Sequence, residues 1–119
     1  MSTTCEAYIG WTVTLKENLN SNDFDFFGEF SEQHGEYCQY DCKGKVLLSV
    51  DGMCSDYARL TYVDEHIKEC WIDGKDYFPL KSPMVPDDIY AMLNEAYHLL
   101  YGKDLDKSLI EYALWFQFS

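Results

Sequence analysis

Over residues 6 to 16, every second side chain is apolar. The apolar positions of this segment are Ala7, Ile9, Trp11, Val13 and Leu15. Successive side chains of a strand point to opposite faces of its sheet, so a spacing of two residues predicts a half-buried strand. The opposite face of that strand would carry Tyr8, Gly10, Thr12, Thr14 and Lys16.

Shorter segments with the same period follow in the middle of the chain. Residues 45–51 and 57–64 each predict a strand, because alternate positions are apolar in both. Residues 69–72 and 77–80 flank Asp73-Gly74, a dipeptide that is typical of tight hairpin turns. Together these segments predict an antiparallel meander.

A longer segment after residue 86 has the period of an α-helix. Pro86 suits the first turn of a helix, Asp87 and Asp88 favour its N-terminal end, and Gly102 would end it. Between these signals the apolar positions form one stripe, which consists of Ile89, Met92, Leu93, Ala96, Leu99 and Leu100. Such a stripe predicts a helix that packs against a sheet. His98, at the border of the stripe, is expected to be a packing residue.

A second, shorter helix is predicted over about residues 23 to 34, with Asn22 as its N-cap and Gly35 as its end. The alternative is a loop with exposed aromatic rings, because Gly28 weakens a helix by about 1 kcal/mol. Residues 105–118 fit either a helix or a strand, and their dense aromatic side chains favour a strand that pairs with residues 6–16. The sequence therefore predicts a single α+β domain over residues 1–119. It would be a mostly antiparallel sheet with two helices packed on one face.

Charge narrows the range of functions. The chain has 21 acidic and 9 basic residues, which gives a net charge of −12, and 47% of its residues are hydrophobic. That apolar content is enough for a core, so disorder is not expected. Direct binding to nucleic acid is not expected either, because phosphate contacts need clustered lysine and arginine. No signal peptide and no apolar run of membrane-spanning length are present, so a cytoplasmic protein with reduced cysteines and no membrane contact is expected.

The acidic charge is concentrated in residues 17–42, which hold seven acidic residues and no lysine or arginine. Aromatic residues are interleaved with these acids, and aromatic side chains are enriched where proteins bind other proteins. Such a segment suits a basic protein surface, since carboxylates on it can imitate a phosphate backbone. The residues predicted to bind a partner are Asp23, Asp25, Phe26, Glu29, Glu32, Glu36, Tyr37, Tyr40 and Asp41.

Two candidate metal sites are alternatives to this interpretation. His34, Cys38 and Cys42, with either Cys54 or Cys70, could supply four zinc ligands, although their spacing departs from the usual Cys-x2-Cys knuckle. The run Asp64, Glu65, His66 and Glu69 could bind a divalent ion on a helix, but a strand would separate its members. No catalytic motif and no phosphate-binding glycine loop occurs, so neither an enzyme nor a cofactor is expected.

These observations support the hypothesis of a small acidic interaction protein. It would inhibit a basic nucleic-acid-binding protein or nuclease by occluding the positively charged groove of that partner. Phage anti-defence proteins, including anti-CRISPR proteins, and immunity proteins against nuclease toxins have such roles, and the analogy is one of size and charge. The alternative function is a small zinc-binding domain built on His34, Cys38 and Cys42 with a further cysteine.

Overall fold

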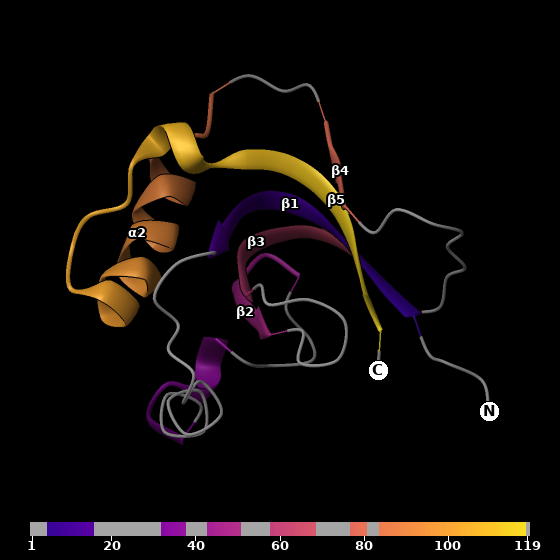
Figure 1. Cartoon of the computed structure of the whole chain (residues 1–119), viewed down its shortest axis with the longest axis horizontal. Helices are drawn as coiled ribbons and strands as arrows, with labels where there is room; N and C mark the ends of the chain where they lie inside the picture. Colours follow the sequence, from indigo (N-terminus) through magenta and orange to yellow (C-terminus); the bar gives the residue numbers. More distant parts are fainter. Residues whose placement is uncertain are drawn as a thin grey trace.

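A computed structural model describes residues 5–15, 32–37, 43–50, 58–68, 77–80 and 84–118 (Figure 1). The strands are β1 (Cys5–Leu15), β2 (Val46–Val50), β3 (Ala58–Ile67), β4 (Tyr77–Pro79) and β5 (Glu111–Phe118). The helical elements are the α-helix α2 (Asp87–Tyr101) and the short 3-10 helices η1 (Gly35–Tyr37) and η2 (Lys107–Leu109). Within the described residues, no helix has the length and apolar character needed to cross a lipid bilayer.

The five strands form one antiparallel sheet in the order β2-β3-β1-β5-β4. The first strand therefore lies at the centre, between β3 and the C-terminal strand β5. The predicted pairing of the two ends of the chain is confirmed, since Tyr8 lies opposite Trp115 and Ala7 opposite Phe116. The predicted α+β class, with a mostly antiparallel sheet, agrees with this architecture.

Two expectations about the elements need correction. The middle of the chain is a meander only through the β2–β3 hairpin, because β4 pairs with β5 at the far edge of the sheet. Two α-helices are predicted, but the described part of the chain has one, α2. The segment of the other predicted helix, about 23 to 34, lies outside the described residues except for residues 32–34, of which 32 and 33 are helical.

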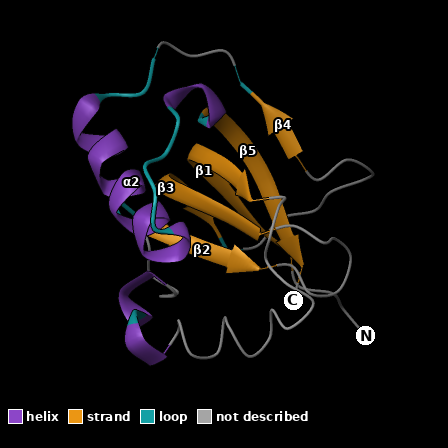
Figure 2. Ribbon diagram, turned by 60° about the vertical axis from the view of Figure 1, so that its left-hand side comes forward, coloured by secondary structure: helices purple, strands orange, loops and turns teal. Residues whose placement is uncertain are grey.

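The helix α2 covers one face of the sheet (Figure 2). Its buried side chains, Leu93, Ala96 and Tyr97, pack on the apolar face of the strands. That face carries the alternating set predicted from residues 6–16, of which Trp11, Val13 and Leu15 belong to this core. The left-handed backbone of Gly102 (φ 71°) ends α2, as predicted, by placing its N–H on the carbonyl of His98.

The opposite face of the sheet has its own buried cluster, which consists of Tyr8, Leu47, Val63 and Trp115. Two buried threonines lie on the same face, and the hydroxyls of Thr12 and Thr61 are 3.1 Å apart. The indole N–H of Trp115 donates to the Thr61 hydroxyl over 3.1 Å. These bonds satisfy the buried polar groups and fix the orientation of the Trp115 ring.

A bulge divides the β1–β3 ladder. Ile9 lies opposite Glu65, but Gly10 lies opposite Val63, so Asp64 is an extra residue in β3. A Cβ atom on Gly10 would lie only 1.8 Å from the carbonyl oxygen of Tyr62. Glycine is therefore required here because the two backbones approach too closely for any side chain.

Candidate functional site

The structure describes three of the residues predicted to bind a partner, which are Glu32, Glu36 and Tyr37. The other six lie outside the described residues: Asp23, Asp25, Phe26, Glu29, Tyr40 and Asp41. Glu32 and Glu36 are exposed, as a contact surface requires, and Tyr37 is half-buried.

Tyr37 connects η1 to the helix α2. Its hydroxyl donates to Glu95 Oε1 over 3.4 Å, and its ring is packed against the core beneath. Burial, with smaller effects from the carboxylates of Glu95 and Glu36, raises the pKa of the Tyr37 phenol above its ordinary value. The phenol thus stays a neutral hydrogen-bond donor between two acidic side chains.

The exposed side of α2 carries a stripe of alternating chemistry. Asp88, Met92, Glu95 and Leu99 are all exposed, and their spacing of four, three and four residues places them in one row along the helix. Leu99 is 45% exposed and Met92 is 38% exposed. The row therefore offers carboxylates and apolar side chains in turn to the solvent.

This row meets η1 at a shallow hollow of about 240 Å³. The lining residues are Glu36, Tyr37, Lys45, Val46, Met92 and Glu95. We call the exposed residues of the row, together with Glu36 and Tyr37, the α2–η1 surface. It joins a segment predicted from charge to a helix that lies more than fifty residues further along the chain.

A second hollow, of about 430 Å³, continues along α2 and shares Glu95 with the first. Its other lining residues are Tyr90, Ala91, Asn94, His98 and Leu99. His98 is exposed, so its predicted role as a packing residue is wrong. The apolar and acidic character of the α2–η1 surface therefore extends toward the C-terminal end of the helix.

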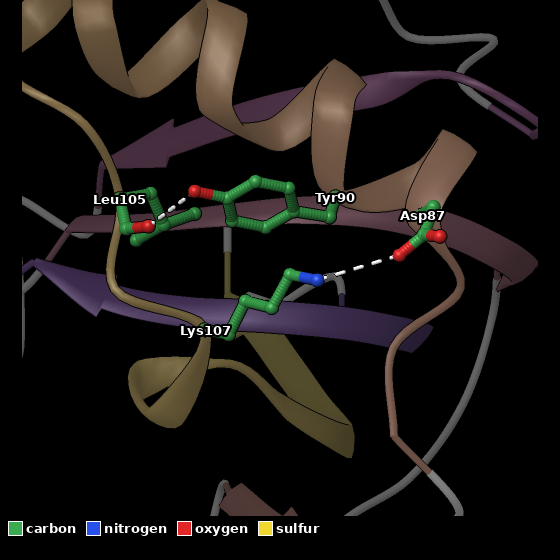
Figure 3. Close-up of polar contacts among 4 residues, drawn as sticks. All are labelled: Asp87, Tyr90, Leu105 and Lys107. Carbon is green, nitrogen blue, oxygen red and sulfur yellow. Dashed lines mark hydrogen bonds and ion pairs between the residues drawn. The ribbon is translucent and has the colours of Figure 1, made fainter.

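Contacts between α2 and residues 105–107 hold the helix in place (Figure 3). Lys107 Nζ lies 3.3 Å from Asp87 Oδ1 and 4.9 Å from the centre of the Tyr90 ring. The Tyr90 hydroxyl donates to the carbonyl of Leu105 over 2.6 Å, and Leu105 N–H donates to Asn94 Oδ1 over 2.8 Å. These contacts hold α2 against the segment that precedes β5, which reduces the entropy lost when a partner binds.

Sequence reasoning missed the contribution of α2 to this surface. Met92 and Leu99 were assigned to the buried stripe, but the helix is turned so that Tyr97 is buried and Tyr90 and Tyr101 are half-buried in their place. The signal was present in the sequence, since the row Asp88, Met92, Glu95 and Leu99 has helical spacing of its own. It was hidden because tyrosine was not counted among the core-facing residues.

The predicted metal sites find no support among the described residues, where no group of three potential metal ligands occurs. His34 is half-buried, with Nδ1 3.9 Å from Glu36 Oε1, whereas Cys38, Cys42, Cys54 and Cys70 lie outside the described residues. The zinc interpretation therefore stays an untested prediction.

Strand β3 places neighbouring members of the acidic run around residue 65 on opposite faces of the sheet, as expected. Glu65 lies opposite Ile9 and pairs with Lys43 over 3.2 Å, whereas His66 lies opposite Tyr8 and stacks on its ring at 4.5 Å. Adjacent residues of a strand face opposite sides of the sheet, so these two side chains cannot share one ion. Glu69 lies outside the described residues.

The described surface can form both charged and apolar contacts. The α2–η1 surface combines exposed carboxylates with a tyrosine and two flexible or branched apolar side chains. Lysine and arginine match such a surface, because their charged ends can meet carboxylates while their hydrocarbon stems cover apolar side chains. Comparison of the chain with protein-family models, with curated proteins and with solved structures found no match.

Proposed function

We propose that the protein is a small acidic inhibitor that binds a basic nucleic-acid-binding protein, such as a nuclease, and occludes the groove that holds its nucleic acid. The observation that carries the proposal is the α2–η1 surface, where exposed acidic and apolar side chains alternate around a hollow. The partner contributes lysine and arginine side chains, and no nucleic acid contacts this protein directly.

Charge supports this choice of partner. The net charge of −12 accelerates encounter with a positive surface, because complementary potentials steer diffusion. Within the α2–η1 surface, the acids Glu36, Asp88 and Glu95 face solvent. Lys45, which lines the hollow, is the basic residue among the lining side chains.

The apolar members of the surface give the complex its lifetime. Exposed charges contribute mainly to the rate of association, whereas burial of apolar side chains slows dissociation. Met92 is well suited to this role, because its flexible thioether adapts to an irregular partner surface. Tyr37 adds a ring held at one edge of the hollow, and tyrosine is enriched among residues that dominate binding energies.

The test starts with the partner. The protein, immobilised, captures proteins from the lysate of its native host at low and high salt, and mass spectrometry identifies those captured. The purified partner is then titrated with the protein at about 0.05 M and about 0.5 M salt. These concentrations lie below and above about 0.1 M, where the Debye length is about 10 Å. Binding is expected to weaken steeply at the higher salt, and the partner is expected to lose its nucleic acid as the complex forms.

Variants locate the contact. The double variant Glu36→Lys with Glu95→Lys is expected to weaken binding at least about tenfold, because two attractive charges become repulsive. Leu99→Ala is expected to raise the dissociation rate with little effect on association. Glu111→Lys is the matched control, since this exposed acid lies on β5, outside the α2–η1 surface. Its folding is verified by thermal melting.

Two results would contradict the proposal. One is a partner that binds this protein and its own nucleic acid at the same time, since occlusion could not then be the mechanism. The other is binding that is insensitive to salt and equal in the double variant and the control.

A further inference from the structure

Arg59 is the one arginine in the chain, and it is buried in the sheet. The residue is only 6% exposed. It lies opposite Thr14 in β1, on the face of the sheet that points away from α2, because Val13 and Leu15 on either side of Thr14 belong to the helix-covered core. A permanent positive charge is thus held inside a strongly acidic protein.

Two aromatic rings enclose the guanidinium. Its central carbon lies 5.1 Å from the centre of the Tyr77 ring and 5.2 Å from the centre of the Trp115 ring. Both distances fall within the range of a cation–π contact. The Trp115 ring is itself fixed by its bond to Thr61, so it forms a firm wall of the site.

Among the described residues, the guanidinium has no ion pair with a carboxylate, which a buried arginine normally has. Its Nε atom is fully buried without a hydrogen-bond partner. No carboxylate of the described residues forms an ion pair with it within 4 Å. Glu111, an acid near the Tyr77 ring, instead accepts a 2.6 Å hydrogen bond from the Tyr77 hydroxyl.

Aromatic faces stabilise the charge but leave the buried Nε–H without a hydrogen-bond partner. A guanidinium presents five N–H donors in a planar fork, and Nε–H is one of them. The fork matches two oxygen atoms of one carboxylate or phosphate group. A buried charge is usually paired and hydrogen-bonded, so the unpartnered Nε–H points to a missing partner.

We propose that Arg59, with Tyr77 and Trp115, forms a binding site for a small oxyanion, a carboxylate or a phosphate. The anion accepts hydrogen bonds from the guanidinium, including its Nε–H, while the two rings keep the cation in position. Tyr77 is the outer wall of this site, because it is half-buried and belongs to β4, a strand of three residues at the edge of the sheet. The site lies on the opposite face of the sheet from α2 and does not depend on the function proposed for the α2–η1 surface.

The experiment follows the indole N–H signal of Trp115 in two-dimensional ¹H–¹⁵N NMR spectra of the whole protein. A Trp115→Phe variant assigns the signal. Sodium phosphate and sodium acetate are titrated separately, with sodium chloride at matched ionic strength as the control. We expect a saturable shift of this signal with phosphate, acetate or both, and none with chloride. Whether phosphate, acetate or both shift the Trp115 signal shows which class of oxyanion the site binds.

Two variants test the role of the arginine. Arg59→Lys keeps the charge but loses the planar fork, and it is expected to weaken anion binding at least about tenfold. Arg59→Gln removes the charge and is expected to abolish the shift. Should the glutamine variant fail to fold, the lysine variant and the titration of the natural protein still decide the question. The proposal is overturned if neither anion shifts the Trp115 signal, or if folded variants bind as tightly as the natural protein.

Discussion

Gly10 shows how one residue can be required by a neighbour that is distant in the sequence. The alternating pattern placed it on the less apolar face of the first strand, where many small or polar residues would fit equally well. The structure shows that this position lies at the bulge, against the backbone of Tyr62. A bulge depends on two strands together, so the sequence of residues 6–16 alone could not have predicted the requirement.

Gly10→Ala is expected to lower the free energy of unfolding by about 1–3 kcal/mol, because the added methyl group forces the strands apart. Urea denaturation measures the change. Gly35→Ala is the matched control, since a Cβ atom there meets no atom within 4 Å. Equal stabilities of the two variants would contradict the close approach at the bulge.

Arg59 is a second residue whose setting could not be predicted. A lone arginine beside Ala58 and Leu60 suggests an exposed side chain on a half-buried strand, because charged groups are rarely buried. Its burial depends on Tyr77 and Trp115, which come from two other strands. The pattern of one sequence contains no information about such contacts between side chains of different strands.

At the scale of elements, the sequence was most informative where one face of a segment is apolar. The strand at residues 6–16, the hairpin of β2 and β3 and the helix after Pro86 were all predicted near their observed bounds. Each buries one face against the same core, so its period is imposed by packing. The pairing of β4 with β5 was not predicted, because a strand of three residues has too short a pattern to specify its neighbour.

The bulge in β3 also affects Tyr112 of β5, on the other side of β1. Asp64 is the extra residue of that bulge. Burial raises the pKa of Tyr112 to about 12, with further contributions from the carboxylates of Asp64 and Glu65. The folded state therefore favours the neutral phenol.

A phenol whose pKa is higher in the folded state stabilises that state fully below its unfolded pKa. Between pH 10.0 and about 12 the unfolded chain has released this proton while the folded protein retains it, so the contribution is lost as pH rises. Asp64→Asn is expected to lower the pKa of Tyr112, as followed by the ¹³Cζ chemical shift of the ring. Asp88→Asn, an exposed acid on α2, is the control. An unchanged Tyr112 pKa in Asp64→Asn would show that burial alone causes the shift.

At the scale of the whole molecule, net charge supports the proposed function but carries little information about the fold. The charge predicts no direct binding to nucleic acid, and it is concentrated in the acidic segment. Of that segment's predicted contact residues, the structure describes Glu32, Glu36 and Tyr37. The charge could not identify the α2 side chains that complete the α2–η1 surface. That part of the site depends on how the helix is turned on the sheet, which is settled by the packing of the tyrosines.

The same charge should limit stability at low salt. Like charges are closer together in the compact state than in the unfolded chain, so screening them favours folding. The Tm is expected to rise between about 0.01 M and about 0.2 M sodium chloride, by about 3–6 °C for each kcal/mol of repulsion relieved. Differential scanning calorimetry measures it, and potassium chloride serves as the control for a specific effect of sodium. A Tm that falls or stays constant would show that repulsion is already balanced within the fold.

The central position of β1 between β3 and β5 has a consequence for the growing chain on the ribosome. Strand β1 has to wait for β5, which is synthesised roughly 100 residues later. At a synthesis rate of about 5–20 residues per second, that delay lasts about 5–20 s. During this time Tyr8 and Trp11 lack their cross-strand aromatic neighbours, Trp115 and Tyr112. One edge of β1 therefore stays open until β5 arrives, and such an edge can pair with another chain.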